Sequence, residues 1–383
     1  MHVLLVCMSL DPAFGTGTAE KAAGLARALM RAGERVTILT IDTFSAARSE
    51  DLRDARMVSL PLLNRRFWIP FPFFHRIREA VASADIVVLT NHWMLLNLAA
   101  ASAARRLGKP TVVIPSGALP ITGRSRLIKR LYNAAGGTRL IFEAAAHIAT
   151  TREEAGNLTA YGVRADRIHV IPNAIELPAV TATGPSPYPT PFILFVGRLT
   201  ATKGPDLLLE AFIRVAGRIP HHCVLAGPDE GMLPALRRTA LRAGLAARVH
   251  IPGAISREEA DRAFASSAIV VVPSRGDAMT LVVLEAAVHA RPLIITDRCG
   301  VGSFAEAGAV RMTAADSTSI ADALFEVLTS SDGGAEMGRT LRQYVAAHYT
   351  WDVIVEHYRR VFQEVAGRGF PRESHNDETA SLT

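Results

Sequence analysis

The stretch VVPSRGDAMTLVVLEAAVHARP, residues 271–292, decides the fold. It completes an apolar run that starts at Ala268 and breaks at Pro273, and such a run predicts a buried strand. A helix is expected to begin near Met279 or Thr280, where the apolar residues resume. A strand that passes through a short glycine-containing loop into a helix is the repeating unit of parallel α/β sheets.

The same strand–loop–helix pattern recurs on both sides of residues 177–190, a segment rich in Pro, Thr and Ala that we interpret as a linker. Residues 1–176 and 191–350 each predict a Rossmann-like, doubly wound parallel-sheet domain, and the two domains are expected to face a central cleft. A last helix over residues 351–365 is compatible with either domain. The polar tail over residues 368–383 is expected to be disordered.

The composition indicates an ordinary globular protein with an excess of positive charge. The 383 residues are 49% hydrophobic and carry a formal net charge of +6, which suits phosphate-bearing ligands, an anionic membrane or nucleic acid. The widely separated Cys7, Cys223 and Cys299 argue against a disulfide framework and favour a cytoplasmic setting. No apolar run approaches the roughly 20 residues that cross a bilayer. The first apolar residues are interpreted as a strand and not as a signal peptide.

A glycine-containing stretch, GTGTAE at residues 15–20, follows the first strand. It is not the dinucleotide fingerprint, because Glu20 stands in place of the third glycine and the stretch begins too far from the strand. We expect a loop over residues 9–18 that brings backbone N–H groups to a diphosphate. A tight turn that needs glycine is the alternative.

Two cations, Arg198 and Lys203, follow the strand predicted over residues 192–196, on one short loop that leads into a helix. Positive charge at the carboxyl end of a strand, close to a helix N-terminus, suits a diphosphate whose negative charge grows as it departs. A solvated surface pair is the alternative.

Two carboxylates, Asp277 and Glu285, stand on either side of the expected helix start in the stretch quoted above. Each can accept two hydroxyl hydrogen bonds, as a ribose diol or a sugar ring offers. Glutamate in an amphipathic helix is usually a surface residue. Glu285, however, lies among apolar neighbours, where a carboxylate needs a partner or a ligand.

Polar residues also follow two strands in the first half of the chain: His92 after the strand over residues 86–89, and Ser116 after the strand over residues 111–114. The carboxyl ends of parallel strands lie at one edge of a sheet, so both residues are candidates for ligand contact. For His92, a structural role and a catalytic role are equally open.

Taken together, these residues resemble the family-4 (group 1) retaining glycosyltransferases of GT-B fold. The family has two glutamates separated by seven residues, and this chain has Asp277 and Glu285 at that spacing. The blocks that carry the resemblance best are residues 196–204, 226–228, 273–274 and 277–292, and residues 172–174 resemble the family's turn before the linker.

The resemblance implies transfer of a sugar from an NDP-sugar to a saccharide or lipid-linked glycan, with retention of configuration and without a metal or a cofactor. It assigns the ribose to Glu285, the sugar hydroxyls to Asp277, and the leaving diphosphate to Arg198 and Lys203; Asp277, Arg198 and Lys203 are the implied catalytic residues. The other donor-binding residues that it implies are Gly17, Thr18, Gly227, Met279, Thr280 and Leu281. The residues that it implies on the acceptor side are His92, Ser116 and Asn173.

This chain departs from the family pattern at four places. Asp277 is one methylene shorter than the usual glutamate, and residues 278–280 replace Gly-Phe-Gly, so we expect a sugar pocket of different shape. Ser116 stands where many members have a histidine, and acid–base catalysis from that position is not expected. Ala290 replaces a helix-ending glycine, and a left-handed alanine costs up to about 2 kcal/mol.

The most aromatic and basic stretch covers residues 64–76 and includes Arg65, Arg66 and Trp68. One interpretation is a packed aromatic loop and a solvated helix face. The other is peripheral docking on an anionic membrane, close to a lipid-linked acceptor. Nucleic-acid binding is not expected, because no recognised module accompanies the charge. A second basic run contains Arg124, Arg126, Lys129, Arg130 and Arg139, and accompanies Leu127, Ile128 and Leu131 on an expected amphipathic helix.

Two alternatives stay open beside the transferase. A non-catalytic sugar-nucleotide binder is one, because Asp277 and Ser116 depart from the family pattern. An NDP-sugar epimerase of the same architecture is the other, and it would need a dedicated acid–base set. We expect a cytoplasmic protein, working at the inner face of the membrane if docking occurs.

Overall fold

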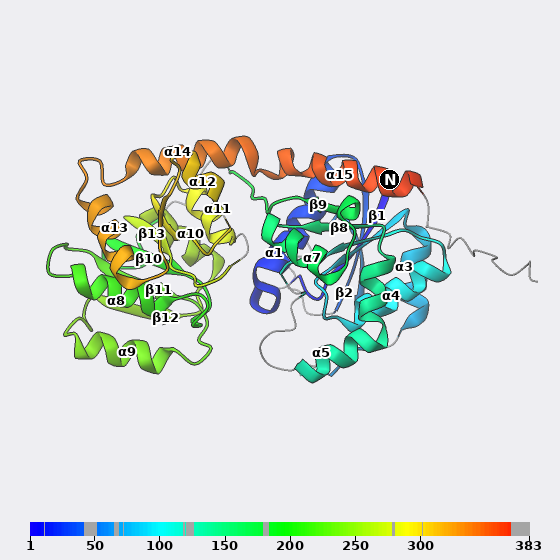
Figure 1. Cartoon of the computed structure of the whole chain (residues 1–383), viewed down its shortest axis with the longest axis horizontal. Helices are drawn as coiled ribbons and strands as arrows, with labels where there is room; N and C mark the ends of the chain where they lie inside the picture. Colours follow the sequence, from blue (N-terminus) through cyan, green and yellow to red (C-terminus); the bar gives the residue numbers. More distant parts are fainter. Residues whose placement is uncertain are drawn as a thin grey trace, which may run out of the picture. The chain divides into compact units, whose positions relative to one another are not determined.

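The computed structural model describes residues 1–10, 12–41, 52–64, 69–71, 73–117, 119, 126–178, 184–277, 280–300 and 302–368. The chain divides into two compact units (Figure 1). Unit 1 contains Met1–Ala149, Glu154–Ile171 and the described residues from Val355 onward, whereas unit 2 contains Thr150–Glu153 and Pro172–Ile354. The last helix, α15 (Trp351–Arg368), therefore starts in unit 2 and ends in unit 1.

Unit 1 is built on a seven-stranded sheet in the order β3-β2-β1-β6-β7-β8-β9, and every neighbouring pair is parallel. The strands are β1 (His2–Val6), β2 (Arg35–Ile41), β3 (Arg56–Leu60), β6 (Ile86–Thr90), β7 (Thr111–Ile114), β8 (Ala146–Ala149) and β9 (Ile168–Val170). A small antiparallel pair consists of β4 (Leu62–Asn64) and β5 (Ile69–Pro70). The helices of this part of the chain are α1 (Pro12–Arg31), α3 (Phe74–Ser83), α4 (Leu95–Arg106), α5 (Arg126–Tyr132), α6 (Thr138–Glu143) and α7 (Arg152–Tyr161).

Unit 2 is built on a six-stranded parallel sheet in the order β12-β11-β10-β13-β14-β15. The strands are β10 (Phe192–Val196), β11 (His222–Ala226), β12 (Val249–Gly253), β13 (Ile269–Val272), β14 (Leu293–Thr296) and β15 (Arg311–Thr313). The helices are α8 (Pro205–Val215), α9 (Leu233–Arg242), α10 (Arg257–Ser266), α11 (Leu281–Val288), α12 (Gly302–Glu306), α13 (Ser317–Thr329) and α14 (Ala335–His348).

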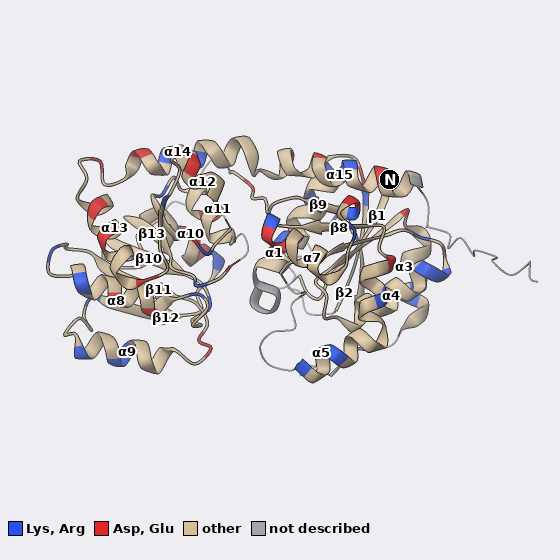
Figure 2. Cartoon of the chain, in the orientation of Figure 1, with Lys and Arg blue, Asp and Glu red and all other residues tan. Residues whose placement is uncertain are grey.

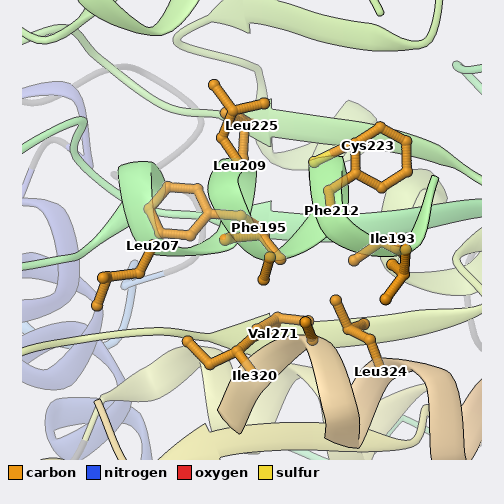
Figure 3. Packing of buried hydrophobic residues seen from close by; sticks show 14 of the residues in the cluster. Ile193, Phe195, Leu207, Leu209, Phe212, Cys223, Leu225, Val271, Ile320 and Leu324 are labelled. Carbon is orange, nitrogen blue, oxygen red and sulfur yellow. The ribbon is translucent and has the colours of Figure 1, made fainter. Parts of the chain in front are cut away.

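Helices cover both faces of the sheet in unit 2. Successive side chains of a strand point to opposite faces, so alternate residues of one strand pack against different helices. Ile193 and Phe195 of β10 pack with residues of α8 and α13, as Figure 3 shows. Phe192 and Leu194 of the same strand pack in a second cluster with Phe264 of α10 and residues of α11. The predicted fold class, two doubly wound parallel-sheet α/β units, is thereby confirmed.

The loop predicted over residues 9–18 is wrong for most of its length, because α1 already begins at Pro12. Proline is well tolerated in the first turn of a helix, where its missing N–H would have no partner. Gly17 and Thr18 therefore lie inside α1, and their N–H groups are not those of a loop after β1.

The segment after β9 is tied to unit 2. Ile175 donates its N–H to the carbonyl of Tyr349 at 2.9 Å and accepts from Trp351 at 3.2 Å. Unit 2 thus begins before the linker predicted over residues 177–190, and residues 179–183 of that linker lie outside the described chain, as does most of the tail predicted to be disordered. All three cysteines are buried and free. None of the described helices combines the length and the apolar character required to cross a membrane.

Candidate functional site

Two loops of unit 2 meet at the carboxyl edge of its sheet, because β10 and β13 are adjacent parallel strands. The first loop joins β10 to α8 and the second joins β13 to α11. Gly204 ends the first loop with a φ of +70°, and a Cβ atom there would lie 2.1 Å from the carbonyl oxygen of Pro273. Only glycine permits this approach. The N–H of Arg275 then donates to the carbonyl of Thr202 at 2.8 Å.

The side chain of Arg275 fastens the same two loops together. Its guanidinium donates to both carboxylate oxygens of Asp206, at 2.9 and 2.6 Å, and to the carbonyl of Ala201 at 2.7 Å. A bidentate pair of this kind fixes orientation as well as distance. The loops that carry the candidate residues are therefore held in a defined arrangement.

Lys203 and Asp277 meet across these two loops. The Nζ of Lys203 donates to Oδ2 of Asp277, and their side chains are only 23% and 16% exposed. The N–H of Asp277 donates to the carbonyl of Arg298 at 3.0 Å. The structure thus brings together the cation and the carboxylate that the sequence singled out from stretches more than seventy positions apart.

A third loop, after β11, packs beside the first. Gly227 has a φ of +145°, and a Cβ atom there would lie 1.9 Å from the carbonyl oxygen of Gly197. The N–H of Leu199 donates to the carbonyl of Pro228 at 2.9 Å. Gly227 therefore sets the spacing of two loops at the carboxyl edge.

Arg198 extends from this region with half of its side chain exposed, and it forms an ion pair with Glu230 at 2.8 Å. Sequence reasoning missed Glu230. Its only signal was an acidic pair, Asp229 and Glu230, directly after the Gly-Pro turn that follows β11.

The helix α11 begins at Leu281, after Thr280 in the N-cap position with an extended backbone. The side chain of Thr280 makes no capping hydrogen bond, and the N–H of Val283 donates to the carbonyl of Thr280 at 3.4 Å. The first-turn N–H groups of a helix point out of its N-terminus, where an anion can bind. Glu285 lies in the second turn and is partly exposed, whereas Val283 and Leu284 beside it are buried. Met279 and Ala278 lie outside the described residues.

Buried polar groups form hydrogen bonds with the loop that carries Asp277. The hydroxyl of Thr296 donates to the carbonyl of Ser274 at 2.5 Å and lies 3.4 Å from the Sγ of Cys299. Burial raises the pKa of the Cys299 thiol, which stays protonated and packs as a small apolar group. Cys299 therefore has a packing role beside Thr296.

In unit 1, Thr18 and Ser116 lie together. They line a cavity of about 10 Å³ with Lys21 and Thr90, a volume that holds one water molecule. Ser116 has a positive φ of 53°, which is unusual for a residue other than glycine.

Sequence reasoning missed the buried charges beside this cavity. The N–H of Gly117 donates to Oε1 of the buried Glu154 at 2.5 Å. Burial lowers the pKa of Lys21 to about 8, against the opposing effect of Glu154. No periodicity in the sequence indicated that these two charged side chains are buried.

His92 is fully buried. Its Nε2 lies 3.1 Å from Oδ1 of Asn133, and its ring packs edge-on against Trp93 and Tyr132. Burial lowers the pKa of His92, so the imidazole is neutral at pH 7. Of the two interpretations left open for His92, the geometry favours the structural one.

The remaining predicted residues are more dispersed. Gly17 is exposed on α1, and Asn173 is partly exposed in the segment that belongs to unit 2. Arg65, Arg66, Trp68 and Arg124 lie outside the described residues. Within the described ranges, no three His, Cys, Asp or Glu residues are grouped closely enough to hold a metal ion.

Comparison with known proteins assigns the family. A family model described as "Glycosyl transferases group 1" matches residues 190–330, and one described as "Glycosyl transferase 4-like domain" matches residues 16–174. A D-inositol 3-phosphate glycosyltransferase from Xylanimonas cellulosilytica is 30% identical over 177 residues, which are 42% of this chain and 42% of that protein. One from Gordonia bronchialis is 31% identical over 260 residues, 61% of this chain and 56% of that protein.

Among solved structures, HepE from Anabaena in complex with UDP and glucose has a TM-score of 0.76 at 17% identity, covering 95% of this chain and 100% of that chain. That likeness shows the fold. The chain belongs to the family-4 (group 1) glycosyltransferases, and its two units have the GT-B fold. It spans about half the length of the curated relatives that it matches.

Proposed function

We propose that this chain is a retaining glycosyltransferase that moves a sugar from an NDP-sugar to a saccharide or lipid-linked glycan, without a metal or a cofactor. The observation that carries the proposal is the ion pair of Lys203 with Asp277, held by two clasped loops that lead into α8 and α11. A cation, a carboxylate that can accept from sugar hydroxyls, and a helix N-terminus are what a sugar diphosphate needs.

Donor binding exchanges the partners within this group. The diphosphate replaces Asp277 as the partner of Lys203, and the released carboxylate accepts hydrogen bonds from the sugar hydroxyls. Arg198 is half exposed, so its ion pair with Glu230 is weak and gives way at little cost. Glu285, one turn into α11, accepts from the ribose hydroxyls.

In the proposed transfer, the bond between the anomeric carbon and the phosphate oxygen breaks, and its electron pair leaves with the nucleoside diphosphate. The acceptor oxygen forms its bond to that carbon from the same face. The acceptor proton passes to the departing phosphate oxygen. Lys203 and Arg198 stabilise the growing charge on the diphosphate, which is the part that a metal ion plays in other sites.

The relatives supply the first donors to test. The HepE structure contains UDP and glucose, so uridine nucleotides come first. In a thermal-shift screen, the NDP-sugar with the correct base and sugar should raise the temperature midpoint of unfolding of the protein. A ligand that binds only the folded state stabilises that state. No shift with any NDP-sugar would refute donor binding.

Assays of turnover then distinguish the transferase from the two alternatives, the epimerase and the non-catalytic binder. A transferase releases the nucleoside diphosphate and does so faster with its acceptor, in EDTA as well as in buffer. An epimerase changes the sugar and keeps the diphosphate bond. A binder shifts the unfolding midpoint but converts nothing.

Peripheral membrane contact is the second part of the proposal, and α5 carries it. Three apolar side chains of this helix are exposed: Leu127 (68%), Ile128 (54%) and Leu131 (61%). The same helix contains Arg126 and Arg130, and Figure 2 shows basic residues in blue on α5. Exposed leucine and isoleucine with arginine on one short helix fit the interface of an anionic membrane.

Vesicle flotation tests this surface. Binding to phosphatidylglycerol vesicles should weaken with salt and be lost in Leu127→Ser/Leu131→Ser. Leu241→Ser is a matched control, because Leu241 is 69% exposed on another arginine-bearing helix, α9. Equal flotation of all three proteins would remove α5 from the proposal.

A further inference from the structure

A turn at the carboxyl edge of the unit 1 sheet is held in a strained conformation. The turn follows β7 and contains Ser116, with a φ of +53°, and Gly117, with a φ of +77°. Serine is sterically strained in the left-handed region, whereas glycine is not. Strain of this kind persists only where other contacts determine the backbone, and it is found mostly at functional sites. The turn is therefore a candidate for contact with a ligand.

The buried carboxylate of Glu154 determines the orientation of this turn. Glu154 lies in the first turn of α7 and is 4% exposed, and its Oε1 accepts from the N–H of Gly117 at 2.5 Å. Burial lowers the pKa of Lys21 in α1, and Glu154 opposes that effect, so the two buried charges attract each other. A hydrogen bond from a backbone N–H to a carboxylate is stronger than one between neutral groups. Glu154 therefore fixes the peptide group between Ser116 and Gly117.

The carbonyl of this peptide group points away from Glu154. The bond between Ser116 and Gly117 is trans, and in a trans peptide the N–H and the C=O point in opposite directions. Within the described part of the chain, the carbonyl oxygen of Ser116 receives no hydrogen bond. A Cβ atom on Gly117 would have nothing within 4 Å beyond its chain neighbours. The turn therefore presents an unused hydrogen-bond acceptor close to open space.

The turn after the neighbouring strand, β6, is held in a similar way. Asn91 has a φ of +59° and donates its N–H to the carbonyl of Ile114 at 2.9 Å. The buried side chain of Asn97, in α4, donates to the carbonyls of Thr90 and Asn91 at 3.0 and 2.6 Å. Two adjacent strands thus end in left-handed turns that buried polar side chains hold in place. They lie at the edge where open parallel sheets bind their ligands.

We propose that Glu154 is a positioning residue for the sugar acceptor, because it orients the carbonyl of Ser116 to accept a hydrogen bond from an acceptor hydroxyl. The inference rests on the proposed transferase function and specifies what unit 1 contributes to it. Saccharides offer many hydroxyl donors, and a carbonyl oxygen with unused lone pairs accepts from them. Glu154 is buried and acts through the turn, while Lys21 balances its charge.

Two variants that share the loss of charge and differ in one acceptor atom test this role. Glu154→Gln keeps an Oε1 that accepts from Gly117, whereas Glu154→Met has a similar length and no oxygen. The assay uses the NDP-sugar selected by thermal shift and the saccharide that most accelerates its diphosphate release. The KM for the saccharide should rise about tenfold in Glu154→Met and stay within about twofold of wild type in Glu154→Gln.

The controls separate positioning from a general loss of structure. Hydrolysis of the NDP-sugar without saccharide, and the KM for the NDP-sugar, should be unchanged in both variants. Glu153→Met changes the exposed neighbour on the same helix and should keep the wild-type KM. Amide hydrogen exchange of Gly117 by NMR should be faster in Glu154→Met than in Glu154→Gln. If either variant fails to fold, both are remade with Lys21→Met, which removes the buried ammonium.

Three outcomes would overturn the proposal: an unchanged saccharide KM in Glu154→Met, an equal rise in both variants, or an equal rise of the KM for the NDP-sugar. Failure of the proposed function gives a different result, because no saccharide then accelerates diphosphate release by the wild-type protein. In that case the positioning role is refuted together with the transferase.

Discussion

Lys203 and Asp277 are bound to each other across the two clasped loops of unit 2, with Nζ donating to Oδ2. Both side chains are mostly shielded from solvent. The ion pair therefore stabilises the folded protein more than a fully exposed pair does, and less than a fully buried pair whose loss leaves one charge unpaired. In the proposed transfer, each incoming donor replaces this contact, so Asp277 affects the affinity for the donor as well as contacting the sugar.

Asp277→Asn should separate these two effects. Without a competing carboxylate, Lys203 is free for phosphate, so the affinity for the free nucleoside diphosphate should rise about fivefold, the equivalent of about 1 kcal/mol. Turnover of the NDP-sugar should fall, because the sugar loses a charged acceptor. Calorimetry and product release measure the two, with the exposed Asp322→Asn as control. Weaker binding of the free diphosphate would contradict the exchange.

Ala290 adopts a φ of +50° directly after α11, as its place in the family's helix-ending glycine position predicts. A left-handed alanine is strained by about 1–2 kcal/mol. Replacing it with glycine removes this strain, but part of the stabilisation is lost because glycine loses more backbone entropy on folding. Ala290→Gly should therefore raise the free energy of unfolding by about 0.5–1 kcal/mol. Urea titration measures it. Ala101→Gly, inside α4, is the control and should lose about 1 kcal/mol; a loss at both positions would show that Ala290 is unstrained.

We expect the buried His147 of β8 to lower the free energy of unfolding as the solution becomes acidic. Burial lowers its pKa from 6.5 to about 4, so between these values the unfolded chain binds a proton that the folded chain does not. Folding stability is fully present above pH 6.5 and falls toward pH 4, by up to about 3 kcal/mol from this group. Urea titrations at pH 7 and 4.5 should show a smaller decrease for His147→Leu than for the wild type. The exposed His357→Leu should keep the wild-type decrease, and equal decreases in all three would discount His147.

Much of the fold could be predicted because its strands are buried on both faces and therefore read as apolar runs. β10 and β13 are examples, with every residue apolar. The edge strands β3 and β15 were not predicted, since their half-exposed residues mix charged, polar and apolar types. The start of α1 was misjudged because Gly15 and Gly17 favour a loop locally, whereas packing decides helix limits in a folded unit.

The candidate site was predictable in its members but not in its contacts. Lys203 and Asp277 each follow a strand, yet their pairing depends on β13 lying beside β10, and strand order is a property of the whole sheet. Glu230 and the buried Glu154 were missed for the same reason, because their partners come from distant segments. The burial of His92 likewise depends on Tyr132 and Asn133, forty positions away.

The release of nucleoside diphosphate from an NDP-sugar in the presence of acceptor tests the central claim most directly. Lys203→Met should lower kcat/KM by about 10²-fold or more, because the departing diphosphate loses its main cation. Lys109→Met makes the same substitution in unit 1, after α4, and should keep wild-type turnover. Retained turnover in Lys203→Met, with circular dichroism showing both variants folded, would contradict the assignment of the donor site.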